Sequence, residues 1–364
     1  MKITDIRLYK LSVPLKVLFR TALRAVEAME SLVVELHTDT GHIGCGEAPA
    51  TAVITGDTLP SIAGAAAGFI GPRLLGVDVA DLEELAHRIQ GSMVHNTSAK
   101  AALDMAVYDL YGQLYGAPLW RLLGGCRREL ETDITISAND VDTMVQDSIR
   151  AVEEGYRILK VKVGRDSAGD LERLRRIRES VPSGTRLRVD ANQGWKPKEA
   201  VRMIRMMEDQ GLDIELVEQP VRAGDPGGLK FVTDHVLTDI LADEAVFSLQ
   251  DAVEIIRTRA ADLINIKLMK TGGIYNALTL CKLAEAYGVG CMIGCMLEGG
   301  IAVSAAAHFA GAMQNVRLAD LDGPALGRYD PVEGGASFCG RTIRLGDAPG
   351  LGIRKVAGLK PLEV

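Results

Sequence analysis

The pattern of hydrophobic and polar positions divides the first third of the chain into two parts. Residues 1 to about 55 alternate between polar and apolar side chains, as in TDIRLYKLSV, which is typical of strands with one buried face. From Leu59 to Tyr115 the apolar residues recur at helical spacing, and Ser98 stands where an N-cap would begin a long helix. These patterns predict an α+β capping domain over residues 1–125.

Beyond residue 130, short apolar runs alternate with amphipathic helices such as KPKEAVRMIRMMEDQG. Eight runs are found, and one residue near the end of each is Thr135, Lys162, Asp190, Glu218, Asp243, Lys267, Cys295 or Asp320. Their separations of 24 to 28 residues match one strand plus one helix. We therefore expect an α/β fold, a modified, TIM-like (β/α)8-type barrel over residues 126–327, with the tail 328–364 packing back on the capping domain.

An open doubly wound sheet is the competing architecture. Such a sheet usually carries a glycine-rich phosphate turn after its first strand, and neither G-x-G-x-x-G nor G-x-x-x-x-G-K-[ST] occurs in the sequence. The barrel is therefore the favoured interpretation.

Composition narrows the classes of partner. The formal charge of −7 over 364 residues, without a Lys/Arg run, argues against a nucleic-acid partner. The amino-terminal segment lacks the apolar core of a signal peptide, and the most apolar stretch, Ile62–Ile70, is too short to cross a bilayer. We expect a cytoplasmic protein without a membrane span. The six cysteines form no C-x-x-C pair, so they are interpreted as thiols.

Three carboxylates end neighbouring strands of the expected barrel. Asp190 ends LRVD, Glu218 ends ELVE and Asp243 ends ILAD. Catalytic groups of such barrels lie at the carboxyl ends of the strands, so these side chains should meet at the mouth. Grouped carboxylates repel one another unless a cation joins them, and an all-oxygen set suits Mg²⁺. The sequence therefore predicts a magnesium site.

Lysines flank this arc of acids. In YRILKVKV the strand period of two places Lys160 and Lys162 on one face, towards the barrel mouth, and Lys267 ends the sixth strand. In a closed ring of eight, the second and sixth strands lie opposite each other. Lys162 and Lys267 should therefore face each other across one ligand of the metal.

Two facing lysines predict a particular chemistry. A carboxylate ligand of Mg²⁺ has an acidified α-proton, because the metal stabilises the enediolate that forms. A Lys base beside Mg²⁺ resembles the arrangement of enolase-superfamily sites. To serve as a base, a lysine must titrate well below its ordinary pKa of about 10.4, and nearby positive charge favours that change. With one base on each face of the carbon, we expect racemisation or epimerisation.

A second acidic pair follows the eighth strand. In VRLADLDGP, Asp320 and Asp322 share a face and lie across the mouth from the metal strands. They suit a substrate cation such as a free ammonium. Arg24 in FRTALR could pair with a second substrate carboxylate from a lid, although its position alone favours an ordinary surface arginine.

The sequence motifs resemble the muconate-lactonising subgroup of the enolase superfamily. The motifs are K-x-K at 160–162, VDANQGW at 189–195, VEQP at 217–220, ADEAVF at 242–247 and NIKLMKTGG at 265–273. Within this subgroup, FRTALR, VITGD, TSAKAA, ETDITIS and DLDGP look like the bacterial dipeptide epimerases that act on L-Ala-D/L-Glu. The segment Glu298-Gly299-Gly300 departs from the pattern expected of them.

The resemblance implies a role for each candidate residue. Lys162 and Lys267 would be the acid/bases, and Lys160 would orient the substrate carboxylate. One Mg²⁺ per subunit would be bound by Asp190, Glu218 and Asp243. Substrate would be bound by Asp320 and Asp322 at the dipeptide ammonium and by Arg24 at the glutamate side chain, with Thr135, Cys295 and Leu297 lining the pocket. The resemblance also implies a homo-oligomer.

Other activities remain open at this point. The same scaffold serves N-acylamino acid racemases, o-succinylbenzoate synthases and cycloisomerases, whose substrates carry no free ammonium. A non-catalytic Mg²⁺-binding barrel is a further alternative.

Overall fold

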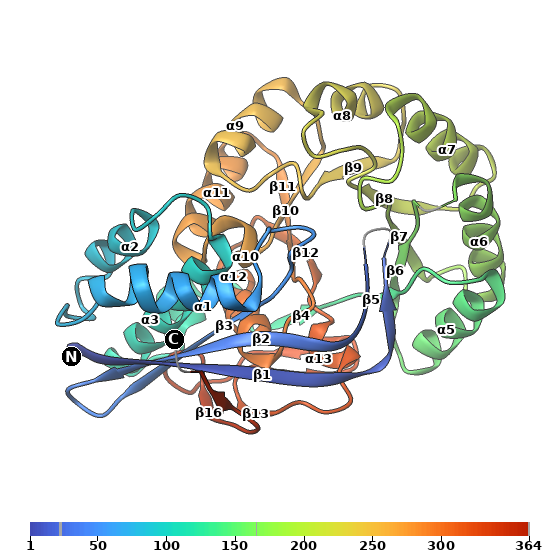
Figure 1. Ribbon diagram of the computed structural model, residues 1–364. Helices are drawn as coiled ribbons and strands as arrows, with labels where there is room; N and C mark the ends of the chain where they lie inside the picture. Colours follow the sequence, from blue (N-terminus) through green and yellow to red (C-terminus); the bar gives the residue numbers. More distant parts are fainter. Residues whose placement is uncertain (22–23, 165, 363–364) are drawn as a thin grey trace.

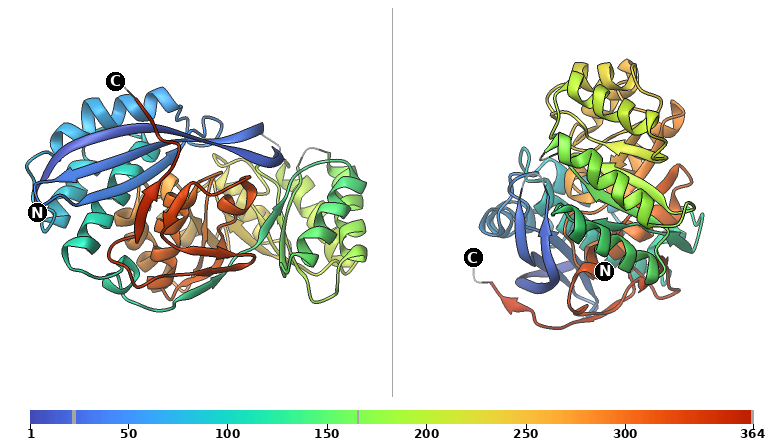
Figure 2. Two further views of the ribbon diagram at one scale, coloured as in Figure 1. Left: turned by 90° about the horizontal axis from the view of Figure 1, so that it is seen from below. Right: turned by 90° about the vertical axis from the view of Figure 1, so that its right-hand side faces the viewer.

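The structure is a computed structural model that describes residues 1–21, 24–164 and 166–362. It has an N-terminal antiparallel sheet with helices, a parallel barrel, and a set of C-terminal strands (Figure 1). The N-terminal sheet lies beside the barrel, and the paired ends of β1 and β2 reach across to the barrel strands (Figures 1 and 2).

The N-terminal sheet has the order β17-β1-β2-β3. Its strands are β1 (Ile3–Arg20), β2 (Ala25–Thr38), β3 (Ile43–Pro49) and β17 (Lys360–Pro361). Alternating apolar residues of β2 form its buried face, with Leu32, Val34 and Leu36 fully buried. The predicted meander is confirmed, and Gly41 in its turn has φ +81°.

Helices cover one face of this sheet. They are α1 (Leu59–Ala65), the single π-helical turn η1 (Ala66–Ile70), the 3-10 turn η2 (Gly71–Arg73), α2 (Leu82–Gln90), α3 (Thr97–Leu114) and α4 (Leu119–Leu122). Helix α3 packs against β3 where β3 carries glycines: a Cβ at Gly46 would lie 1.8 Å from the Ala102 carbonyl oxygen. Glycine is therefore required for this close approach.

The prediction that Ser98 caps α3 is wrong. The helix begins at Thr97 after the left-handed Asn96, so Ser98 lies inside its first turn and is buried. The Ser98 amide donates to Asp57 Oδ2 at 3.2 Å. The carboxylate of Asp57, 41 residues earlier, thus accepts the hydrogen bond that a local N-cap side chain would accept. Sequence patterns at helix starts cannot reveal such a distant partner.

The second sheet has eight parallel strands in the order β12-β11-β10-β9-β8-β7-β6-β5. The strands are β5 (Ile134–Ile136), β6 (Ile158–Lys162), β7 (Arg186–Asp190), β8 (Ile214–Glu218), β9 (Asp239–Ala242), β10 (Leu263–Ile266), β11 (Gly290–Gly294) and β12 (Val316–Asp320). All eight expected strands are present, and together they form the nearly closed barrel visible in Figure 1.

Helices alternate with these strands on the outside of the barrel (Figure 1). They are α5 (Val141–Glu153), α6 (Ser167–Ser180), α7 (Pro197–Asp209), α8 (Pro226–Thr233), α9 (Leu249–Thr258), α10 (Leu268–Thr271), α11 (Ile274–Ala286), α12 (Gly300–Ala312) and α13 (Gly323–Leu326). Among the described residues, the short α13 is the only helix after the eighth strand, so the last strand–helix unit of the barrel is incomplete.

The barrel closes through side chains. Among the described residues, β5 and β12 end the sheet order without sharing a ladder. The Thr135 amide donates to Asp322 Oδ2 at 2.7 Å, and the Leu321 amide donates to Thr132 Oγ1 at 2.8 Å. We refer to this contact between β5 and β12 as the seam.

The C-terminal segment returns to both earlier parts. Its strands are β13 (Val332–Gly334), β14 (Ser337–Cys339), β15 (Thr342–Arg344) and β16 (Ile353–Val356). Strand β15 pairs with β4 (Glu129–Glu131), which precedes the barrel, whereas β17 adds to the edge of the N-terminal sheet at β1. The tail therefore connects the two larger parts. Among the described residues, no helix is long and apolar enough to cross a membrane.

Candidate active site

Three carboxylates meet at the carboxyl ends of adjacent barrel strands. Asp190 and Glu218 are paired in the β7–β8 ladder, and Asp243 follows β9 directly. Each is at most 1 % exposed. We refer to Asp190, Glu218 and Asp243 as the first acidic group.

Lysines lie against this first acidic group. Lys162 Nζ lies 2.5 Å from Asp190 Oδ2, and Lys267 Nζ lies 2.7 Å from Asp243 Oδ2. Lys160 Nζ lies 2.7 Å from Glu218 Oε2 and 3.2 Å from Asp190 Oδ2. The period of two in β6 is confirmed, because Lys160 and Lys162 both face the site.

The electrostatics of the first acidic group favour a cation. Burial, together with repulsion from Asp190 and Asp243, raises the pKa of Glu218 to about 8. Three adjacent buried carboxylates form an oxygen-only donor set, which is suited to a hard divalent ion, so these residues fit Mg²⁺.

The pKa of Lys267 shifts opposite to the lowering expected of a base. Burial and Lys160 disfavour its charged form, but the carboxylates of Asp243 and Glu218 outweigh both, so its pKa is raised. A divalent cation on those carboxylates would remove this pairing, which links the basicity of Lys267 to metal binding.

The loop after β8 holds Asp243 in place. Gln219 has φ +36°, a strained backbone conformation for a residue with a side chain. Its Oε1 accepts hydrogen bonds from the amides of Asp243 and Ala245 at 2.9 and 3.0 Å. Asp243 is thus positioned by Gln219, which follows the end of the neighbouring strand β8.

Two residues that contact the first acidic group were not predicted from the sequence. Asn265 Nδ2 donates to Glu218 Oε1 at 2.9 Å, and Lys270 Nζ lies 2.7 Å from Asp243 Oδ1. Both are fully buried. Asn265 precedes Lys267 by two positions, so the strand period would have found it. Lys270 lies on the short α10, where no strand rule applies.

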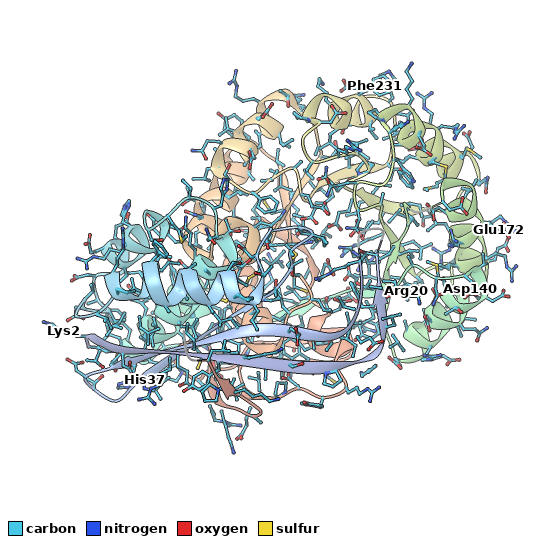
Figure 3. All side chains as sticks on the ribbon, in the orientation of Figure 1. Lys2, Arg20, His37, Asp140, Glu172 and Phe231 are labelled. Atoms are coloured by element: carbon cyan, nitrogen blue, oxygen red, sulfur yellow. The ribbon has the colours of Figure 1, made fainter. Side chains whose placement is uncertain are left out.

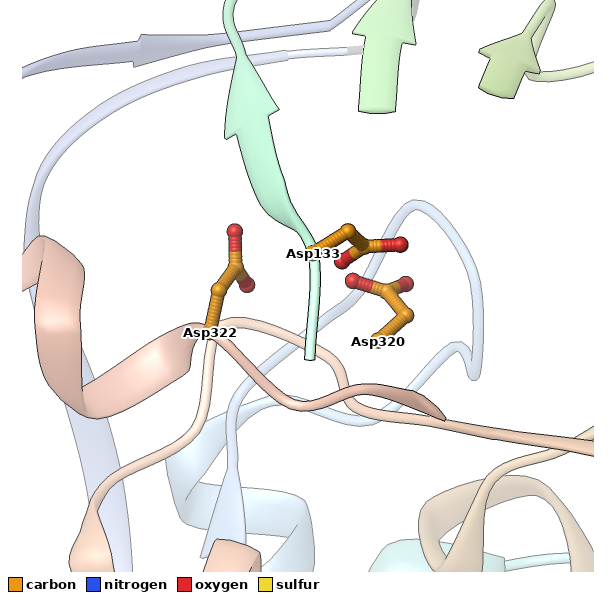
Figure 4. A group of neighbouring side chains, drawn as sticks. All are labelled: Asp133, Asp320 and Asp322. Atoms are coloured by element: carbon orange, nitrogen blue, oxygen red, sulfur yellow. The ribbon is translucent and has the colours of Figure 1, made fainter. Parts of the chain in front are cut away.

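A second acidic group lies on the other side of Lys160. Asp133, Asp320 and Asp322 each place a carboxylate oxygen within 4.8 Å of the others, close enough to share a cation (Figure 4). All three are buried. Asp133 was also missed, although it shares a strand face with Thr135.

Two cations contact the second acidic group, and both are shared with other carboxylates. Lys160 Nζ lies 2.6 Å from Asp320 Oδ2, and Arg188 Nη1 lies 2.8 Å from Asp133 Oδ2. Lys160 also contacts Glu218, and Arg188 also contacts Glu215. Among the described residues, Asp322 has no cation partner, so its carboxylate is the one suited to a substrate cation.

One small cavity of about 50 Å³ joins the candidate residues. Its lining includes Arg24, Thr135, Lys160, Lys162, Lys267, Cys295, Leu297, Asp320 and Asp322, as well as Phe19, Val53, Ile54 and Asn192. The structure therefore brings together every residue expected to contact substrate or carry a proton. The first acidic group lies beneath this cavity, in contact with its lysines.

Arg24 reaches this cavity from the N-terminal sheet, just before β2. Burial lowers the pKa of its guanidinium, and no carboxylate among the described residues pairs with it. A half-buried arginine without a carboxylate partner beside a cavity is suited to an anionic group of a ligand.

The unexpected segment Glu298-Gly299-Gly300 begins α12. Glu47 of β3 accepts hydrogen bonds from the amides of Gly299 and Ala302 at 3.0 and 3.1 Å. A Cβ at Gly299 would lie 2.5 Å from Glu47 Oε1. The glycine is thus explained by a carboxylate from the N-terminal sheet that caps a barrel helix.

Two family models match the chain. Residues 3–124 match the mandelate racemase / muconate lactonizing enzyme N-terminal domain, and residues 143–355 match the enolase C-terminal domain-like family. The L-Ala-D/L-Glu epimerase of Clostridium acetobutylicum is 52 % identical over 356 residues, covering 98 % of this chain and 99 % of that protein.

Solved structures agree with this relationship. The substrate-liganded L-Ala-D/L-Glu epimerase from Bacillus subtilis superposes with a TM-score of 0.97 at 49 % identity, covering 98 % of this chain and 100 % of that one. The dipeptide epimerase from Enterococcus faecalis, complexed with Mg and L-Leu-L-Tyr, has a TM-score of 0.94 at 41 % identity, with the same coverage. The chain therefore belongs to the mandelate racemase / muconate lactonizing enzyme family of the enolase superfamily.

Proposed function

We propose that this protein is a Mg²⁺-dependent isomerase that epimerises the second residue of a dipeptide, with L-Ala-D/L-Glu as the favoured substrate. One observation carries the proposal: Lys162 and Lys267 come from β6 and β10, four strands apart in a sheet of eight, and line the same cavity. Two such groups can reach opposite faces of one carbon. Relatives that act on L-Ala-D/L-Glu, at 52 % and 49 % identity, support the substrate.

The two lysines exchange a proton with the α-carbon. One neutral Nζ removes the proton from one face, and the ammonium of the other returns a proton to the opposite face, which inverts the centre. Lys160 holds the substrate carboxylate, where negative charge develops. Mg²⁺ held by Asp190, Glu218 and Asp243 would supply further electrostatic stabilisation of that charge.

The ends of the dipeptide are held by opposite charges. Asp320 and Asp322 bind the ammonium, since both line the cavity and Asp322 has no cation partner among the described residues. Arg24 binds the glutamate side-chain carboxylate as a charge-assisted pair. Thr135, Cys295 and Leu297 form the walls between these ends. An N-acylated substrate has no cation for Asp322, which disfavours the N-acylamino acid racemase alternative.

The proposal is tested by incubating the protein with Mg²⁺ and L-Ala-L-Glu in D₂O and following the Glu α-proton by NMR. We expect exchange of this proton together with formation of L-Ala-D-Glu. Exchange with N-succinyl amino acids but not with dipeptides would favour the racemase instead. Absence of exchange with both classes would defeat an α-carbon isomerase.

Single-lysine variants test the two-base geometry. Lys162→Ala and Lys267→Ala should each abolish inversion but retain exchange from one epimer, and the retained epimer should differ between them. Lys230→Ala is the matched control, because Lys230 pairs with Asp234 on the outer helix α8. Retention of the same epimer by both variants would contradict bases on opposite faces.

A further inference from the structure

Two buried side chains beside the first acidic group have an oxygen atom without a partner. Asn192 comes two positions after Asp190, and Glu244 comes directly after Asp243. Asn192 and Glu244 are each 5 % exposed. Within the described part of the chain, Asn192 Oδ1 and Glu244 Oε2 have no hydrogen-bond partner. Buried polar atoms are rarely unpaired in native proteins, so both oxygens require a donor from outside the chain.

The two side chains form one polar pair. Asn192 Nδ2 donates to Glu244 Oε1 at 3.5 Å, which joins the loop after β7 to the loop after β9. The Asn192 amide donates to Asp190 Oδ1 at 2.9 Å, and Asn192 lines the small cavity over the lysines. The pair therefore adjoins both the first acidic group and the cavity.

Gln219 fixes the backbone of both members of the pair. Asn192 and Gln219 have left-handed backbones, with φ +42° and +36°. The amide after Asn192 donates to the Gln219 carbonyl at 2.8 Å. The amides of the residues before and after Glu244 donate to Gln219 Oε1 at 2.9 and 3.0 Å. Unusual backbone conformations that the surrounding structure holds in this way are typical of ligand-binding sites.

Both unpaired atoms are hydrogen-bond acceptors, and this identifies the kind of group that fits them. A water molecule that binds a cation through its oxygen has two hydrogens left to donate. Mg²⁺ prefers six oxygen ligands, and it usually retains several waters when a protein binds it. An amide oxygen and a carboxylate oxygen beside the metal ligands can therefore hold one of these waters, as outer partners of metal sites commonly do.

We propose that Asn192 Oδ1 and Glu244 Oε2 accept the two hydrogen bonds of one water molecule that Mg²⁺ carries at the first acidic group. The inference rests on Mg²⁺ binding in the proposed function, but not on the identity of the dipeptide. Asn192 and Glu244 are positioning residues that act on the metal through the water. Glu244 thus has a role distinct from that of the three metal ligands, although it directly follows one of them.

Titration calorimetry with Mg²⁺ alone, without dipeptide, tests the pair. Glu244→Gln replaces one acceptor oxygen by a donor nitrogen, and Asn192→Gly removes the side chain while suiting the left-handed backbone. We expect each substitution to raise Kd for Mg²⁺ by about tenfold to a hundredfold. Glu208→Gln is the matched control, because Glu208 accepts the amides of Leu237 and Thr238 from the outer helix α7, so Kd should keep its wild-type value.

Thermal unfolding separates this role from a structural one. Without Mg²⁺, both variants should unfold at the wild-type temperature. A fixed concentration of Mg²⁺ should raise that temperature less in the variants than in the wild type, because it binds them more weakly. A lower melting temperature of the metal-free variants, together with an unchanged Kd for Mg²⁺, would overturn the proposal.

Glu244→Gln also tests the rival explanation, in which a proton on Glu244 pairs the two side chains with each other. Glutamine has the shape of a protonated glutamate and would satisfy such a pair, so an unchanged Kd in this variant would overturn the water assignment. It decides alone if Asn192→Gly does not fold. A raised Kd in only one of two folded variants would also overturn a shared water. Failure of the wild type to bind Mg²⁺ would overturn the proposed function as well.

Discussion

The two acidic groups at the barrel mouth differ in how the fold holds them. In the first acidic group, Asp190 and Glu218 end adjacent strands that are hydrogen-bonded to each other in the parallel sheet. Asp243 directly follows the next strand. The carboxylates of the second acidic group come from β5 and β12, which meet only at the seam. Lys160 lies between the groups and contacts both.

The groups also differ in the cations that contact them. Four lysines contact the three carboxylates of the first group, yet burial and repulsion from Asp190 still raise the pKa of Glu218 to about 8. In the second group, Lys160 and Arg188 contact Asp320 and Asp133, whereas Asp322 has no cation partner among the described residues. The proposed function accordingly assigns a metal to the first group and a substrate ammonium to the second.

The largest effect is expected in the first acidic group. Glu218→Gln removes a central carboxylate while keeping its shape, so we expect loss of Mg²⁺ binding by calorimetry and a fall of about 10³-fold in kcat for L-Ala-L-Glu. Glu215→Gln is the control, because Glu215 lies on the same strand but pairs with Arg186 and Arg188 away from the mouth. Retained Mg²⁺ affinity in Glu218→Gln would contradict the difference between the groups.

A smaller and different effect is expected in the second acidic group. Asp322→Asn should lower kcat/KM for L-Ala-L-Glu by about 30-fold or more, because truncating one partner of a buried charge pair costs about 2–5 kcal/mol. Mg²⁺ affinity should stay at its wild-type value. N-propionyl-L-Glu, which has the shape of the dipeptide without its ammonium, should bind no more weakly to the variant than to the wild type. Equal losses for both compounds would exclude the ammonium role.

Asp133 should have a weaker influence, because it lies beneath Asp320 rather than on the cavity. Asp133→Asn keeps an oxygen for Arg188 but removes one charge, so we expect KM for L-Ala-L-Glu to rise about fivefold with little change in kcat. A fall in kcat without a change in KM would indicate a structural role instead. Thermal unfolding of the variant separates a loss of fold from a loss of charge.

The smallest effect is a dependence of substrate binding on pH. Burial, then repulsion from Asp320, raises the pKa of Asp322 to about 6. Below that pH the carboxyl gains a proton and loses its attraction for the ammonium, so Kd for L-Ala-L-Glu should rise about fourfold from pH 7 to 5.5. Titration calorimetry at both values measures this change. In Asp322→Asn the change should disappear; its persistence would assign the titration to another group.

The fold was predictable where it depends on local periodicity. All eight barrel strands were found because short apolar runs recur at a near-constant spacing, and six of the eight runs end in a charged residue, as LRVD does before Ala191. Contacts between residues far apart in the sequence leave no such periodic pattern. The carboxylate of Asp57 caps α3 from a distant loop, and β17 joins β1 from the other end of the chain.

The candidate site was predictable for the same reason, and only in part. Side chains at strand ends, such as Lys162 and Asp190, are visible in the sequence. Charged residues further inside the apolar strands, such as Arg188, were not predicted to be part of the site. The strand period, applied two positions back from each strand end, would have found Arg188, Asp133 and Asn265. Lys270 lies outside that rule, because a helix follows β10 at once.

The seam gives the barrel an unusual dependence on its own ligand site. Elsewhere in the sheet, backbone ladders join each strand to the next, whereas between β5 and β12 the described contacts use side chains, and the Asp322 carboxylate accepts the Thr135 amide. The same side chain borders the cavity. Separation of β5 from β12 would therefore displace the wall of the cavity. A ligand bound by Asp322 would in turn stabilise the contact between these two strands. Asp322 therefore takes part both in closing the barrel and in lining the cavity.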